Sequence, residues 1–170
     1  RKISFITGKA CSIALKKKGY KVRELDAKAN FVTKLKRIKP DIVFNALHGK
    51  YGEDGLIQSI LEYLKIPYTH SGVISSSLAM DKVLSRNIFK KNGIRVPKYF
   101  LLKSNYKDNL FIKMKTQGIK FPIVIKPINE GSSVNVFICT KKSIFQKINL
   151  LENYKKIIIE EFIPGREIQA

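Results

Sequence analysis

The stretch His48-Gly-Lys-Tyr-Gly-Glu-Asp-Gly55 directly follows the run Asp41-Ile-Val-Phe-Asn-Ala-Leu47, and together they decide the fold. The largely apolar run predicts a buried strand, and the three glycines predict a sharp turn at its carboxyl end. Open α/β sheets bind their ligands at that end. A plain turn is the alternative. It has no evident need for a histidine and two acids so close together, so the pattern favours a functional loop.

Helical and strand-like patterns alternate on both sides of this loop. The apolar spacing predicts helices over 4–18, 31–38 and 53–64, and strands over 20–25, 41–47 and 66–69. This alternation predicts an α/β fold with a parallel sheet covered by helices. Such a unit usually opens with a strand, whereas this chain opens with a helix. We therefore expect a first strand to be missing and Arg1 to be a truncation point.

Residues 1–80 form one predicted domain, and residues 81–170 form a second. The second region's patterns predict helices over 81–92, 106–117 and 141–151, and strands over 96–102, 121–126, 134–139, 156–162 and from 166 onward. The last strand stops at Ala170 with no capping residue, so we expect that end to be cut as well.

Composition excludes several classes of protein. No apolar run approaches the ~20 residues that span a bilayer, so no membrane role is expected. The net charge of +20 suggests nucleic acid, but the basic residues are mostly lysines spread thinly along the chain, and only six are arginines. A nucleic-acid partner is therefore disfavoured. Cys11 and Cys139 are isolated, which predicts reduced thiols in the cytoplasm rather than a disulfide or metal site.

Four features of the second region converge on a nucleoside triphosphate. Lys126 ends an apolar strand and could face phosphates; a lysine extending to solvent is the alternative. The loop 130–133 could cradle phosphates with its backbone amides, or be an ordinary hairpin. The strand 156–162 could offer unpaired backbone groups to an adenine edge. The strand ends in the paired acids Glu160 and Glu161, and Glu167 beyond it could accept ribose hydroxyls, although each acid alone is typical of a solvated surface group.

The chain resembles the D-alanine–D-alanine ligases of the ATP-grasp superfamily over essentially its whole length. The segments that carry the resemblance occur in family order: Arg1-Lys-Ile-Ser4, His48-Gly-Lys-Tyr-Gly-Glu-Asp-Gly55, Tyr68-Thr-His-Ser-Gly72, Met80-Asp-Lys82, Lys126-Pro127, Glu130-Gly-Ser-Ser-Val134 and Glu160-Glu-Phe-Ile-Pro-Gly-Arg-Glu167. The resemblance implies that residues 1–80 are an N-terminal substrate-side domain. It also implies that residues 81–170 are the central subdomain of an ATP-grasp fold, truncated at its C-terminus.

The implied activity is ATP-dependent joining of two D-alanines through an acylphosphate, for peptidoglycan precursors. ATP and D-alanine are the implied substrates, Mg²⁺ the implied cofactor and a cytoplasmic homodimer the implied assembly. The resemblance places Ser132 in a catalytic hydrogen-bond network and His48 and Glu53 at the first D-alanine. It assigns to ATP the residues Lys82, Lys126, Ser133, Glu160, Ile163 and Glu167.

Two parts of the family pattern lie outside this sequence. One is an acid that in the family directly precedes the position of Arg1 and binds the amine of the first D-alanine. The other lies after Ala170 and holds the intermediate-stabilising arginine, the magnesium ligands and a lid. No metal ligand is therefore expected within the chain, and the isolated chain is expected to be inactive. A non-catalytic nucleotide-binding remnant and an ATP-grasp ligase with a different acceptor remain the alternatives.

Overall fold

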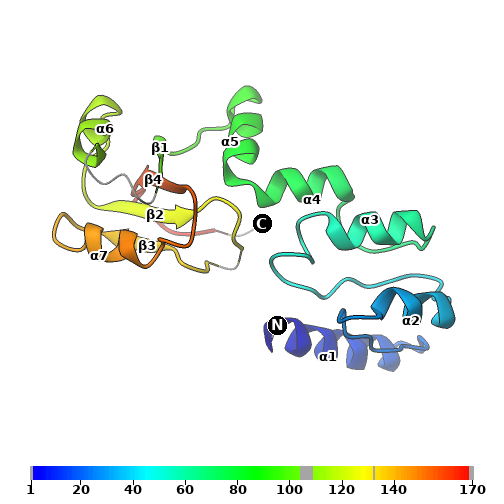
Figure 1. Cartoon of the computed structure of the whole chain (residues 1–170). Helices are drawn as coiled ribbons and strands as arrows, with labels where there is room; N and C mark the ends of the chain where they lie inside the picture. The colour runs from blue at the N-terminus through cyan, green and yellow to red at the C-terminus, as the bar shows by residue number, and fades with distance from the viewer. Residues whose placement is uncertain (1, 104–108, 132, 169–170) are drawn as a thin grey trace. The chain divides into compact units, whose positions relative to one another are not determined.

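The computed structural model describes residues 2–103, 109–131 and 133–168. The chain divides into two compact units, Arg1–Met80 and Asp81–Ala170. Figure 1 colours the first unit from blue to green and the second from green to red. In the described part of the chain, none of the helices combines the length and apolar character that a membrane crossing needs.

The first unit is built mainly from helices. They are α1 (Lys2–Lys17), α2 (Phe31–Ile38), α3 (Leu56–Tyr63) and α4 (Val73–Met80). The first three were expected from apolar spacing. Helix α3 starts later than expected because Gly55 at its N-cap has a left-handed φ of 95°, which no α-helical residue has. The carboxylates of Glu53 and Asp54 bind loop amides instead. Helix α4 was not expected, since its three serines interrupt any apolar stripe.

The parallel sheet expected in the first unit is present as one bridge. Val43 and Tyr68 pair in parallel, with Val43 N donating to Pro67 O at 2.8 Å and Thr69 N donating to Val43 O at 3.0 Å. Residues 20–25 form no strand. A small core closes this unit around the buried side chains of Leu35, Ile57 and Leu61. The glycine-rich loop 48–55 lies between the bridge residue Val43 and helix α3, whose Ile57 and Leu61 belong to this core.

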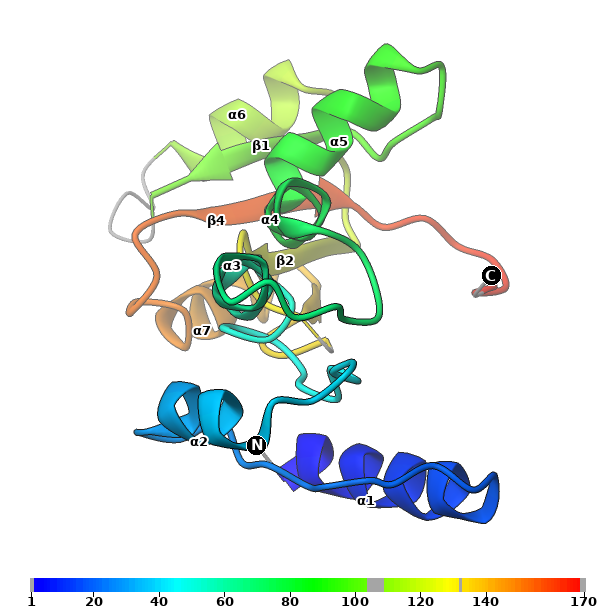
Figure 2. The same cartoon turned by 90° about the vertical axis from the view of Figure 1, so that its right-hand side faces the viewer.

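The described residues of the second unit form a four-stranded sheet and three helices. The elements are α5 (Lys82–Lys91), β1 (Tyr99–Leu102), α6 (Leu110–Thr116), β2 (Ile123–Pro127), β3 (Phe137–Cys139), α7 (Ile144–Asn149) and β4 (Ile157–Glu161). The strand order is β1-β4-β2-β3, and every neighbouring pair is antiparallel. Figure 2 shows β4, in red, between β1 and β2. The strand expected from residue 166 does not form within the described residues.

The two faces of this sheet differ in chemistry. Along β2 the burial alternates, as expected for a strand whose successive side chains point to opposite faces. Ile123 and Ile125 belong to the apolar core, which also includes side chains of α6 and α7. Lys126 lies on the opposite face. The molecule is thus a mixed α/β protein, as the sequence predicts, with a polar sheet face in its second unit.

Candidate functional site

Glu160 is the centre of a charged cluster on the polar face of the sheet. Its register partners are Tyr99 on β1 and Val124 on β2, so Lys126, two residues after Val124, lies on the same face. Lys126 Nζ is 2.5 Å from Glu160 Oε1. Glu160 is only 5% exposed, so its charge needs partners inside the protein.

Helix α5 supplies two more cations from one face, because Lys82 and Arg86 are four residues apart. Asp81 caps the helix through Oδ1, which accepts hydrogen bonds from the first-turn amides. Arg86 Nη2 donates to Glu160 Oε2. Lys82 Nζ donates to the carbonyl of Ile128 at 3.3 Å and to the carbonyl of Glu130. The cap therefore fixes the helix end that presents these cations.

The cluster holds more positive than negative charge. Arg86 and Lys126 pair with the Glu160 carboxylate, and Lys82 is close enough to interact electrostatically with all three. The Glu130 carboxylate accepts a hydrogen bond from Tyr154 at 3.1 Å. Burial lowers the pKa of Lys82, and the charge of Lys126 lowers it further. An anion bound here would relieve this repulsion between cations.

The loop expected to cover phosphates is described in part. Ser133 is exposed and has a positive φ of 56°, and Val134 N donates to Gly131 O at 3.0 Å. Ser132 lies outside the described residues. Glu130, at the start of this loop, is tied through Tyr154 to Asn135, whose Nδ2 donates to the tyrosine hydroxyl at 2.9 Å.

The predicted nucleoside residues beyond β4 are exposed. The expectation of free backbone groups along 156–162 is wrong for most of that range, because β4 lies between β1 and β2 and is paired on both sides. Ile163 follows the paired residues and is 60% exposed. Glu167 is also exposed. The structure brings Lys82, Lys126 and Glu160 together and leaves Ile163 and Glu167 on the segment after the sheet.

In the first unit, His48 and Glu53 lie side by side. His48 Nδ1 is 3.4 Å from Glu53 Oε1, and Gly49 N donates to Glu53 Oε2 at 2.6 Å. Helix α1 positions the histidine: Thr7 Oγ1 is 3.0 Å from His48 Nε2, and His48 N donates to Ser4 Oγ at 3.1 Å. The imidazole and the carboxylate are both half-buried, so each is fixed yet open to solvent.

Close packing explains two glycines of this loop. A Cβ at Gly52 would lie 2.3 Å from Leu47 Cβ, and a Cβ at Gly55 would lie 2.4 Å from Ser77 Oγ. The carbonyl of Gly52 accepts hydrogen bonds from Asn45 Nδ2 at 2.8 Å and from Gln58 Nε2 at 3.0 Å. These glycines thus serve the shape of the loop, and its chemistry rests on the charged side chains.

Comparison with known proteins matches the two halves of the chain to two consecutive segments of one protein family. The D-Ala–D-Ala ligase N-terminus model matches residues 20–71, and the corresponding C-terminus model matches residues 88–170. The chain is 55% identical to the D-alanine–D-alanine ligase of Pelagibacter ubique (strain HTCC1062) over 100% of its own length and 56% of the relative's. The chain belongs to the D-alanine–D-alanine ligase family. It spans about half the length of the curated relatives it matches.

Solved ligase structures share the fold of this ligase-family chain. A D-alanine–D-alanine ligase from Bacillus anthracis matches 96% of the chain with a TM-score of 0.82 and 34% identity, covering 54% of that ligase. A structure of a Bacillus anthracis D-alanine–D-alanine ligase complexed with ATP matches 96% of the chain with a TM-score of 0.77 and 30% identity, covering 55% of that protein.

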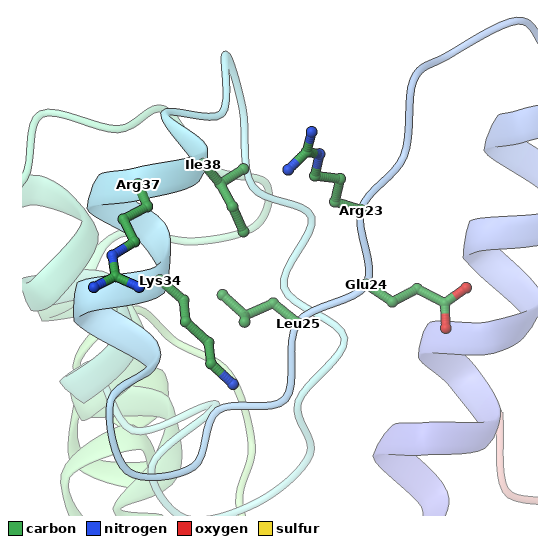
Figure 3. Close-up of a pocket in the computed structure, with 6 residues that line it drawn as sticks. All are labelled: Arg23, Glu24, Leu25, Lys34, Arg37 and Ile38. Atoms are coloured by element: carbon green, nitrogen blue, oxygen red, sulfur yellow. The ribbon is translucent and has the colours of Figure 1, made fainter.

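Other parts of the ligase-family chain offer less chemistry. Within the described residues, no group of three or more His, Cys, Asp and Glu side chains could hold a metal ion. A pocket of about 510 Å³ in the first unit is lined by Arg23, Glu24, Leu25, Lys34, Arg37 and Ile38. Glu24 points away toward α1 (Figure 3), where Ser12 Oγ donates to it at 2.7 Å and lowers its pKa. None of the predicted site residues lines this pocket.

Sequence reasoning missed the residues that support the site. Arg86 could have been found, because it follows Lys82 by four residues on a predicted helix. The contacts of Ser4 and Thr7 with His48 could not have been found. These residues are 44 and 41 positions from His48 in the sequence, and only the fold brings them together.

Proposed function

We propose that this chain provides the nucleotide-binding residues and the first D-alanine-binding residues of an ATP-dependent D-alanine–D-alanine ligase. In this reaction ATP phosphorylates the carboxylate of one D-alanine. The amine of a second D-alanine then attacks the acylphosphate, giving the dipeptide, ADP and phosphate. The names of the curated relatives and the likeness to an ATP-complexed ligase support this proposal.

The observation that carries the proposal is the excess of cations around Glu160. A triphosphate would draw Lys82 and Lys126 from internal acceptors to its own oxygens, and would offset the mutual repulsion of the cations. We assign the adenine to Glu160 and to the backbone of Ile163. Glu167 is assigned to the ribose, and the loop of Ser132 and Ser133 to the phosphates, with Ser132 also in the catalytic hydrogen-bond network.

The first D-alanine is assigned to His48 and Glu53. Their side chains are 33% and 41% exposed, so a small ligand can reach both. An acidic and a basic side chain together suit an amino acid, which carries both an ammonium and a carboxylate. The hydrogen bond from the Gly49 backbone N–H to the Glu53 carboxylate restricts this side chain before a ligand binds. Such preorganisation favours binding of a small, rigid ligand.

Mg²⁺ is implied by the family, but the two acids beside Lys82 and Lys126 do not fit its ligand set, and no group of three or more candidate ligands occurs among the described residues. Glu160 is held by two cations and Glu130 by Tyr154. We therefore propose that the magnesium ligands and the arginine for the tetrahedral intermediate lie in sequence that this chain does not contain. The homodimer and the cytoplasmic location stay predictions. A different acceptor and a non-catalytic nucleotide-binding remnant are less favoured, because the matched relatives are named D-alanine–D-alanine ligases.

Two measurements on the 170-residue chain test the proposal. Calorimetric titration with ATP is expected to show saturable binding. A phosphate-release assay with ATP and D-alanine is expected to show no D-alanine-dependent turnover, since the magnesium ligands are proposed to lie outside the chain. Failure to bind ATP would overturn the nucleotide assignment. Formation of the dipeptide would overturn the placement of essential catalytic groups outside the chain.

A further inference from the structure

Arg86 is a buried cation that the proposed reaction does not use. It is 8% exposed and lies on α5, and its Nη2 donates to Glu160 Oε2. Its Cζ lies 4.7 Å from the centroid of the Tyr99 ring, and Tyr99 is the register partner of Glu160. Arg86 is therefore held between an aromatic ring and the carboxylate.

The two carboxylate oxygens of Glu160 contact two different cations. Arg86 takes Oε2, and Lys126 takes Oε1. The Lys126 side chain is 18% exposed, against 9% for Arg86, and a lysine has a long flexible stem. The planar guanidinium is fixed by two contacts, so Lys126 is the cation that can leave.

On the proposed function, a triphosphate attracts Lys126 and frees Oε1 of Glu160. A buried carboxylate that loses every cation is strongly disfavoured, so a second partner must remain. From this geometry we infer that Arg86 is a positioning residue of the nucleotide site. It holds the Glu160 carboxylate, so that the freed oxygen accepts a hydrogen bond from the 6-amino group of adenine.

A second observation also points to a ligand. Among the described residues, Arg86 Nη1 is buried without a hydrogen-bond partner. Buried guanidinium donors are normally satisfied, and an unmet one is costly. N3 and N7 are acceptors in adenine and in hypoxanthine alike, so either base bound beside Glu160 can supply the missing partner. Arg86 thus has one bond to the carboxylate and one donor left for the base.

The test compares ATP with inosine triphosphate, which carries a carbonyl oxygen where adenine has its 6-amino group. The measured quantity is the ratio of the two dissociation constants, from calorimetry on the 170-residue chain. The unmodified chain is expected to prefer ATP by about tenfold or more, the range for a hydrogen bond to a charged group. Arg86→Met is expected to bring the ratio close to one, and Arg86→Lys to restore part of the preference.

Two controls separate positioning from general damage. Lys126→Met should weaken both nucleotides and keep their ratio, because it acts on the phosphates. Lys90→Met, at an exposed position on the same helix, should change neither constant. A ratio that stays at the unmodified value in folded Arg86→Met would overturn the inference. If the unmodified chain binds neither triphosphate, the proposed function itself fails.

A double variant covers the case in which Arg86→Met does not fold. In Glu160→Gln the buried carboxylate is gone, so adding Arg86→Met leaves no uncompensated acid. If Arg86 acts on the 6-amino group through Glu160, the double variant should show the same ratio of the two dissociation constants as Glu160→Gln alone, while loss of the Nη1 donor weakens both nucleotides alike. A further loss of preference for ATP in the double variant would show that Arg86 acts independently of Glu160, and would overturn the inference.

Discussion

Lys126 on β2 and Glu160 on β4 form an ion pair of 2.5 Å across neighbouring antiparallel strands. The pair is diagonal, because Lys126 is in register with Ile158, two residues before Glu160. It puts a partly exposed lysine beside a buried acid on the polar face of the sheet. On the proposed function, a bound nucleotide separates the two residues, with its phosphates at Lys126 and its base at Glu160.

The first prediction concerns Lys126→Ala. The variant is expected to bind ATP more weakly by about 1.5–3 kcal/mol, the usual value of a charge-assisted contact. Glu160 keeps Arg86, so the fold should persist. Calorimetry gives the affinity, with Lys90→Ala on the exposed face of α5 as the matched control. Equal losses in the two variants would mean that Lys126 makes no specific contact with the nucleotide.

A second prediction separates the two ligands. Glu53→Gln keeps an oxygen that can accept the bond from Gly49 N but removes the charge beside His48. D-Alanine binding should weaken several-fold, while ATP affinity should stay unchanged because no ATP contact is assigned to this loop. Separate titrations with D-alanine and with ATP measure both. Unaltered D-alanine binding, or a loss confined to ATP, would contradict the assignment of this loop.

The lowered pKa of Lys82 gives a prediction for stability against pH. Below the folded-state pKa the buried ammonium destabilises the fold, and this effect fades as the pH rises through that pKa toward the ordinary value of 10.5. The unfolding free energy of the unmodified chain should therefore rise relative to Lys82→Met over that window. Lys82→Met also loses the hydrogen bonds from Lys82 Nζ to two backbone carbonyls. Their loss changes the unfolding free energy by a constant amount at every pH at which Lys82 is charged.

Denaturant unfolding of both proteins at a series of pH values gives this difference. A difference that is flat from neutral pH to 10.5 would mean that Lys82 has no lowered pKa.

Gly52 provides a prediction about packing. A Cβ there would lie 2.3 Å from Leu47 Cβ, so Gly52→Ala should lower the unfolding free energy by about 1–3 kcal/mol, as overpacking does. Gly8→Ala is the control, because its Cβ would meet Ala46 Cβ at an ordinary 3.6 Å within helix α1. That change should be neutral or stabilising by up to about 1 kcal/mol. Equal effects on unfolding would contradict the close approach at Gly52.

The sequence predicts best those elements whose determinants lie within a few residues of one another. Helices α1, α2, α3 and α5 follow from apolar spacing and from a cap such as Asp81, which act within a few residues. Strands depend on partners elsewhere, so the strand-like run 20–25 forms no strand. The pairing of β4 on both sides also comes from topology, and it removes the free backbone edge that the sequence suggested.

The same distinction applies to the site. Lys126 and Glu160 were each recognised from the end of an apolar strand, but their ion pair depends on a strand register that no local pattern encodes. The spacing from Lys82 places Arg86 on the same helix face, but its pairing with Glu160, 74 residues away, comes only from the fold. For Ser132 the prediction stands as made, since that residue lies outside the described part of the chain.

A two-dimensional NMR titration of the labelled chain with ATP would locate the nucleotide site residue by residue. We predict that the largest shift changes cluster at Lys82, Lys126, Glu160 and Ile163, while the amides of the loop 48–55 stay unchanged. Shift changes centred instead on the basic pocket of Arg23, Lys34 and Arg37, or no saturable changes at all, would contradict the proposed site.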